Sequence, residues 1–262
     1  MTVADRATVE GAMPAADLGL ADVAQLRQGA YRLLGALFLY PETERWTELV
    51  AAAPEFQQYE HILARFAFFD SWRRLMTTLS ESSPVAVAAL ESEYMRLFLV
   101  STGEPLCAPY ESAYLTPPGA ASGAVEAQLQ GEYVAAGVVV SPGLAEPWDH
   151  VAIELEFMAH LCAQEASAWE EVGADGDPLL SPDRSASLPT DTAQVLDRQR
   201  AFLHHHLAVW FPAFARQVVA ASPDSLYARG VEAGAAFIHH DRDFVALLME
   251  GWSGWKRDAV TG

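Results

Sequence analysis

Cysteine is scarce in this chain, and lysine is scarcer still. The 262 residues include two cysteines, Cys107 and Cys162, and one lysine, Lys256. The cysteines lie far apart and neither has a second cysteine nearby, which excludes a CxxC redox pair, a four-cysteine zinc site and a disulfide framework. A GxxxxGK[ST] phosphate-binding loop is absent because no other lysine exists to complete it. These absences favour a reducing compartment and exclude a P-loop nucleotidase.

Other catalytic and targeting signatures are missing as well. The chain has no GxGxxG loop and no HExxH motif, and no histidine follows an acidic residue by three positions, as in di-iron bundles. Its first residues show neither a basic region nor an apolar core of the kind that a secretory signal needs. No apolar run reaches the length of a membrane span. We therefore expect a cytoplasmic protein without stable membrane insertion.

Basic residues are also few relative to acidic ones. Sixteen Lys and Arg residues stand against 35 Asp and Glu residues, which gives a net charge of −19. Such a chain repels a phosphate backbone, so nucleic acid is not expected as a partner. It would attract a basic partner, but charge alone favours the simpler interpretation that it keeps the protein in solution. The hydrophobic fraction of 51% excludes a disordered chain.

Apolar residues recur at three- and four-residue steps through most of the chain, and no strand-like alternation persists. This period predicts an all-α fold, a single globular helical bundle with a hinge loop before a long helix over residues 147–171. We expect residues 1–21 to form a flexible tail and residues 22–252 a helical domain. Within the domain we expect a hinge at about 138–147 and a flexible excursion at about 173–191. The other helices are predicted over residues 23–38, 42–53, 55–79, 84–98, 122–136, 192–208, 212–221, 223–239 and 244–252.

Two histidine groups invite a metal-site interpretation, His204-His205-His206 and His239-His240-Asp241. Consecutive residues on a helix point about 100° apart, so they cannot converge on one ion. We predict no metal site and expect both groups to lie on solvated helix faces. Asp149, His150 and Glu154 could form a local acid–base cluster, but no nucleophile is assignable beside them. The sequence therefore predicts no enzymatic activity.

The segment Glu146-Pro147-Trp148-Asp149-His150 opens the predicted long helix. Pro147 suits a first helical turn, and Asp149 suits the positive end of the helix dipole. Helix capping accounts less well for Trp148 and His150.

The stretch EPWDHVAIELEFMAHL resembles the Glu-Pro-x-Asp-His signature of the TorD/DmsD family of redox-enzyme maturation chaperones. The resemblance runs from about residue 24 to 245 and includes a Pro-rich loop of residues 100–121. Three further stretches agree with the family in order and spacing: YRLLGALFLYP, EYMRLFLVSTGEPLCAPYESAYL and HHHLAVWFPAFARQVVAASPDSLY. Two departures concern the client's identity: Tyr94 stands where some relatives carry Trp, and the excursion at 173–191 is longer than expected.

The resemblance implies a cytoplasmic chaperone that binds the twin-arginine signal peptide, the unfinished body, or both, of a molybdopterin-containing oxidoreductase of the dimethyl-sulfoxide-reductase type. It implies that the chaperone assists cofactor insertion before export. The residues that it assigns to client binding are Glu146, Pro147, Asp149 and His150 in the recognition groove, Tyr94, Leu97 and Phe98 in its apolar wall, and Tyr110 and Glu111 as nearby candidates. Carboxylates would bind the two guanidinium groups, and the wall would bind the apolar helix that follows them.

Several alternatives stay open at this stage. The client could be a nitrate-reductase-like subunit that is never exported, or, in a different class, the chain could hydrolyse a nucleotide. No cofactor is expected to bind stably; the alternatives are transient contact with the client's molybdopterin guanine dinucleotide and weak binding of a guanine nucleotide. The chain could act as a monomer or as a homodimer. For Tyr94, Leu97 and Phe98, plain core packing competes with a role in client binding.

Overall fold

The computed structural model describes residues 18–82, 87–99, 105–116, 123–138, 146–174 and 190–260. Helices follow one another through these ranges, and none of the residues described belongs to a strand, which confirms the all-α prediction. The helices are α1 (Leu20–Leu37), α2 (Thr43–Gln57), α3 (Glu60–Leu63), α4 (Phe69–Glu81), α5 (Val87–Phe98), α6 (Ser112–Leu115), α7 (Ala124–Ala135), α8 (Val151–Ala174), α9 (Thr190–His205), α10 (Leu207–Ala221) and α11 (Leu226–Val260).

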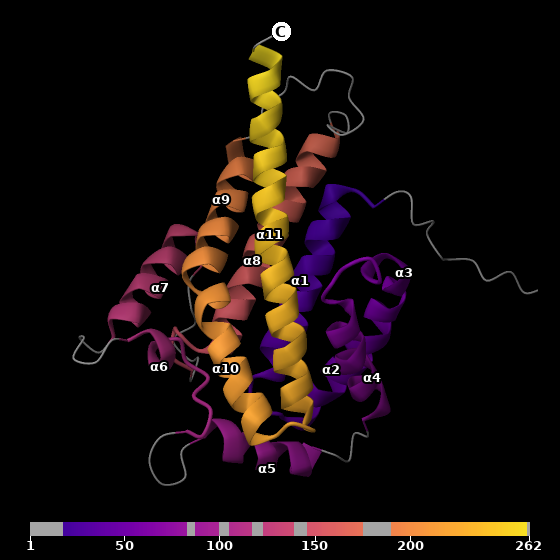
Figure 1. Ribbon diagram of the computed structural model, residues 1–262, viewed down its shortest axis with the longest axis vertical. Helices are drawn as coiled ribbons and strands as arrows, with labels where there is room; N and C mark the ends of the chain where they lie inside the picture. Colours follow the sequence, from indigo (N-terminus) through magenta and orange to yellow (C-terminus); the bar gives the residue numbers. More distant parts are fainter. Residues whose placement is uncertain are drawn as a thin grey trace, which may run out of the picture.

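The long helices run along the long axis of the molecule (Figure 1). Helix α1 packs along α8, and α11 packs against α4, α9 and α10. Helices α2 to α4 cover one flank, while α6 and α7 lie on the other (Figure 1). Helix α5 crosses the lower end in this view. No helix in the described ranges is long and apolar enough to cross a bilayer.

Two glycines of α11 allow this helix to approach its neighbours closely. A Cβ on Gly234 would lie 2.8 Å from Cζ of Phe211, and a Cβ on Gly230 would clash with Cδ2 of Leu37. Phe211 and Leu37 are both buried. Because the Phe211 ring is fixed among other core aromatics, small residues are required where α11 meets α10.

A buried polar network ties four helices together at the centre of the bundle. Arg27 of α1 donates to Asp241 of α11 (Nε to Oδ1, 2.5 Å) and is also paired with Glu165 of α8. The Tyr31 hydroxyl donates to Asp241 Oδ2 (2.7 Å), and Gln199 Nε2 of α9 donates to Glu165 Oε2 (2.9 Å). All five side chains are buried, so loss of any one partner would leave an uncompensated charge or polar group.

This network corrects one prediction and explains another. Asp241 was expected on a solvated face, and it is 1% exposed, although its neighbour His239 is exposed as predicted. Because Asp241 is held inside the bundle, the chain stays helical through residues 240–243, and α11 joins the two separate helices predicted over 223–239 and 244–252.

Other boundaries also differ from the predictions. The helix predicted over 55–79 is interrupted by turns at residues 58–59 and 64–68, where Phe66 stacks on Phe68 at 5.9 Å between ring centroids. The helix predicted from residue 212 begins at Leu207 and carries Pro212 inside it. The predicted tail, hinge and excursion lie largely on residues 1–17, 139–145 and 175–189, which are outside the described ranges.

We expect Gly234→Ala to destabilise the fold, because the new methyl group meets the fixed Phe211 ring. Overpacking of this kind should outweigh the gain in helix propensity and lower the free energy of unfolding by about 1–2 kcal/mol. Urea unfolding followed by circular dichroism measures the change. Gly131→Ala on α7 is the matched control, since a Cβ at this position would have no atom within 4 Å; it should stabilise slightly. Equal stabilisation by both variants would contradict this account of the α10–α11 contact.

Candidate functional site

A segment of residues 105–116, called the strap below, is hydrogen-bonded both to the end of α5 and to the turn that precedes α8. The N–H of Cys107 donates to the carbonyl of Leu97 (2.8 Å), and the N–H of Glu111 donates to the carbonyl of Asp149 (3.0 Å). The strap thus joins two of the predicted site segments. In addition, the N–H of Val151 donates to the carbonyl of Pro109 (2.8 Å), and Tyr110 and His150 form an isolated antiparallel bridge.

Asp149 fixes the strap through its side chain as well as its backbone. Its carboxylate Oδ2 accepts the N–H of Ser112 (3.0 Å), which is the first residue of α6. This bond satisfies a donor at the start of a helical turn. Asp149 is 1% exposed, so its carboxylate is not accessible to another molecule while the strap is in place.

The backbone of this turn also sets where α8 begins. The predicted start at Pro147 is wrong, because residues 147–150 form a turn in which the N–H of His150 donates to the carbonyl of Pro147 (3.1 Å). Helix α8 starts at Val151. The backbone groups of Asp149 and Val151 are bonded to the strap instead of to a first helical turn.

His150 is fully buried beside Tyr110, with 5.4 Å between the ring centroids. Burial lowers the pKa of His150 to about 4, so the ring is neutral at pH 7. Its Nδ1 accepts the N–H of Ala152 (3.1 Å), which places the remaining proton on Nε2. Nε2 lies 3.7 Å from Oε2 of Glu146 and has no hydrogen-bond partner among the residues described.

Beneath the strap lies an ion-pair cluster centred on the buried His206. Both carboxylate oxygens of Glu111 lie close to His206 Nδ1, at 2.9 and 2.8 Å, and Glu132 Oε1 of α7 lies 3.1 Å from Nε2. Burial alone would lower the pKa of His206, but the hydrogen bonds that its ring nitrogens donate to Glu111 and Glu132 outweigh burial and raise the pKa to about 9. His206 is therefore a charged imidazolium at pH 7, and it links the strap to α7 and to the junction of α9 and α10.

Glu154 extends this cluster into the bundle. Its Oε2 accepts the indole N–H of Trp210 (3.0 Å), and no donor group of the described residues reaches its Oε1. Burial and the neighbouring Glu111 carboxylate raise the pKa of Glu154 well above its ordinary value. Glu154 thus keeps a proton where its charge would be uncompensated.

The sequence did not predict the role of His206 or Glu132. His204 and His205 are exposed, as expected, but His206 is 2% exposed, which contradicts the predicted solvated face. The spacing held a signal: His206 lies four residues from both Phe202 and Trp210, and all three face the core. Its acidic partners, in contrast, are 95 and 74 residues away along the chain.

Comparison with known proteins bears on these residues. Residues 63–216, more than half of the chain, match the family model described as nitrate reductase delta subunit. The chain belongs to this family of TorD- and NarJ-type redox-enzyme maturation chaperones. The match includes the strap, α7, α8 and the His206 junction.

Individual relatives agree with the family. The chain is 32% identical to the chaperone protein TorD of Vibrio cholerae over 161 residues, which are 62% of this chain and 64% of that protein. It is 27% identical to TorD of Aeromonas salmonicida over 202 residues, or 74% and 82% of the two chains. It is 29% identical to the chlorate reductase assembly chaperone protein of Ideonella dechloratans over 151 residues, or 58% and 68%. These relatives are named as chaperones and not as enzymes, in agreement with the prediction of no enzymatic activity.

The residues predicted for the apolar wall of this TorD-family member lie in its core. Tyr94, Leu97 and Phe98 are each no more than 2% exposed. The Tyr94 hydroxyl donates to the carbonyl of Phe38 (3.2 Å), and the Phe98 ring packs on Phe214 at 5.9 Å. Contact of these three residues with a client stays a prediction.

Three predicted residues form the accessible part of the region. They are Glu146, Pro147 and Tyr110, and each is partly exposed. Burial raises the pKa of the Tyr110 and Tyr94 hydroxyls, and the nearby Glu146 carboxylate raises the pKa of both further. Sequence segments around residues 94–98, 110–111 and 146–150 are thus brought together by the strap. Their binding of a client is a prediction that the geometry leaves open.

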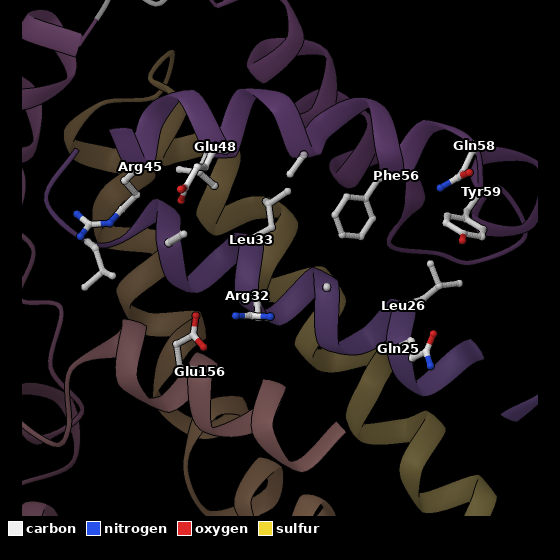
Figure 2. Close-up of a pocket in the computed structure, with 15 residues that line it drawn as sticks. Gln25, Leu26, Arg32, Leu33, Arg45, Glu48, Phe56, Gln58, Tyr59 and Glu156 are labelled. Atoms are coloured by element: carbon white, nitrogen blue, oxygen red, sulfur yellow. The ribbon is translucent and has the colours of Figure 1, made fainter. Parts of the chain in front are cut away.

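A separate groove of about 590 Å³ lies between α1 and α2 and reaches Glu156 of α8 (Figure 2). Figure 2 shows Arg45 and Glu48 at one end and Gln58 and Tyr59 at the other. None of the predicted site residues lines it. Its rim carries both signs of charge, so its electrostatics do not select one kind of ligand.

The raised pKa of His206 makes stability depend on pH. A folded-state pKa of about 9 against an ordinary value of 6.5 gives a contribution that is complete below pH 6.5 and is lost as the pH rises toward 9. At full strength it amounts to about 3 kcal/mol. We expect urea unfolding of the native chain to show this loss between pH 6.5 and 9.

His206→Gln should be less stable at pH 6.5 and should lack this part of the pH dependence. His204→Gln, an exposed neighbour on α9, is the control and should change the free energy of unfolding by less than about 0.5 kcal/mol. A His206→Gln chain with the same pH profile as the native one would contradict a charged His206.

Proposed function

We propose that this chain is an assembly chaperone for the catalytic subunit of a molybdopterin oxidoreductase of the dimethyl-sulfoxide-reductase type. Family membership supports the chaperone class. Relatives carry the names chaperone protein TorD and assembly chaperone of chlorate reductase and of selenate reductase. The chain spans 64% of the length of the Vibrio cholerae TorD protein, so its own client is part of the proposal.

The observation that carries this proposal is the gathering of acids and aromatics around one strap. Glu111, Asp149 and Glu154 lie within one cluster, and Glu146 borders it at the surface. Trp210 contributes the apolar side of the same cluster through its contact with Glu154. An acidic, aromatic region suits a guest that carries both positive charge and apolar surface.

A twin-arginine leader is such a guest, since two guanidinium groups precede its apolar helix. The Glu146 carboxylate is partly exposed and has no arginine partner among the described residues, so it can receive the first guanidinium. A charge-assisted bond of this kind contributes about 1.5–3 kcal/mol where water is excluded. The net charge of −19 favours the approach of a basic leader at long range.

In this proposal the chaperone acts in the cytoplasm and holds the unfinished subunit until its cofactor has been inserted. The chaperone itself binds no cofactor stably. Contact with the client's molybdopterin guanine dinucleotide, or with a free guanine nucleotide, would be transient. Chaperone and client would separate before export.

A second candidate client is a nitrate-reductase-like subunit that is never exported. The description of the matching family, nitrate reductase delta subunit, favours it. The two candidates differ in one respect that can be measured. A leader with an Arg-Arg pair binds in the first case, while a client N-terminus without that pair binds in the second.

We expect the chain to bind a synthetic leader in which an Arg-Arg pair precedes a Leu/Ala helix. A Gln-Gln version should bind at least about tenfold more weakly, because the loss of one charge-assisted bond costs about 1.5 kcal/mol or more. Glu146→Gln combined with Asp149→Asn should cause a similar loss. Asn keeps an oxygen that can accept the Ser112 N–H, so the strap should stay folded. Isothermal titration calorimetry measures all three affinities.

Glu48→Gln, in the groove between α1 and α2, is the matched control and should leave the affinity unchanged. If the double variant binds as tightly as the native chain while Glu48→Gln binds weakly, the leader occupies the other groove. Equal binding of the Arg-Arg and Gln-Gln peptides would instead favour the non-exported client.

A further inference from the structure

Asp149 and His150 present a difficulty for the proposed function in this structure. Asp149 is 1% exposed and His150 is fully buried, and both are bonded to the strap. Glu111, on the strap itself, is 2% exposed and bonded to His206. No client can touch these three residues unless the strap moves.

The strap makes the same kinds of contact that a leader peptide would make. Its Ser112 N–H donates to the Asp149 carboxylate, as a guanidinium N–H would. The Tyr114 ring stacks on Trp210 with 5.4 Å between centroids, as an apolar side chain of a guest helix would. Helix α6 of the strap is a single turn that packs on α10 and α7 (Figure 1).

Two buried polar atoms close to the strap have unmet hydrogen-bonding capacity. Within the described ranges no donor reaches Oε1 of Glu154, and Nε2 of His150 has no acceptor within hydrogen-bond distance. Both residues are fully buried. A guest guanidinium would donate to Glu154 once this carboxyl has released its proton to solvent, and a free backbone carbonyl of the guest would supply the acceptor for His150.

We propose that the strap is an intramolecular occupant of the client site, held closed by the Glu111–His206 ion pair, and that an arginine-bearing apolar segment of the client binds by displacing it. This inference rests on the proposed function. In the open state Asp149, His150, Glu154 and Trp210 together would face the guest, with acids for the guanidinium groups and an indole for the apolar helix. Glu111 and His206 are positioning residues here, because they act through the strap.

The Glu111–His206 ion pair, called the latch below, has other charged groups around it that also affect the charge of His206. Glu111 reaches it from the strap and Glu132 from α7, while Glu154 of α8 lies next to Glu111. Asp149 is bonded to the strap at Ser112 and lies close enough to Glu154 to raise its pKa. Removal of the Glu111 charge breaks the link to the strap but leaves His206 paired with Glu132, so the α7 contact survives.

Hydrogen exchange of the native chain with and without the synthetic Arg-Arg leader tests displacement directly. The amides of Cys107, Glu111 and Ser112 make the bonds that hold the strap. We expect them to exchange faster in the complex than in the free chain. Slower exchange of these amides in the complex would show that the client covers a closed strap, and would overturn the proposal.

Glu111→Gln tests the latch in a way that separates it from client contact. With the latch weakened, the competent open state is more populated, and the association rate of the leader should rise about tenfold. If Glu111 instead touches the client, the same variant should bind more weakly, which would overturn the proposal. Glu44→Gln, an exposed residue of α2, is the matched control and should leave the rate unchanged.

His206→Gln provides a second variant with the same expected direction, and His204→Gln is its control. Absence of any binding by the native chain would overturn the proposed function and this inference with it. Binding to the native chain without strap release, or without faster association in either latch variant, would overturn this inference alone.

Discussion

A charged imidazolium held between two carboxylates organises the functional end of this molecule. His206 is shielded from water, and its charge is tolerable only because Glu111 and Glu132 bracket the ring at hydrogen-bond distance. Through these bonds His206 links the strap and helix α7 to the junction of α9 and α10. The ion pair adds to the backbone bonds that hold the strap over Asp149 and His150.

The fold was largely predictable from the sequence, because helical periodicity is a local property. The stop at Gly137, which has a φ of 80°, depends on a few neighbouring residues. The predicted helix boundaries were wrong where contacts with residues far away in the sequence determine whether the helix continues. The helix predicted over 223–239 continues instead through Asp241, whose partner Arg27 lies 214 residues away along the chain.

The candidate site was predictable only in part, and for the same reason. The Glu-Pro-x-Asp-His motif indicated which residues belong to the family's functional region, and the strap brings them together with Tyr110 and Glu111. The sequence could not show that Asp149 and His150 are covered, since their burial results from backbone bonds to residues about 40 positions earlier. Nor could it pair His206 with Glu111.

We propose that the client binds where the strap lies, between the start of α8 and α10. A leader peptide with a nitroxide spin label beside its Arg-Arg pair, bound to the ¹⁵N-labelled chain, tests it most directly. We expect paramagnetic broadening of amide signals around Glu154 and Trp210, with little effect on Gly29 and Ala52 in the groove between α1 and α2. Broadening centred on Gly29 and Ala52, with Glu154 and Trp210 unaffected, would contradict it.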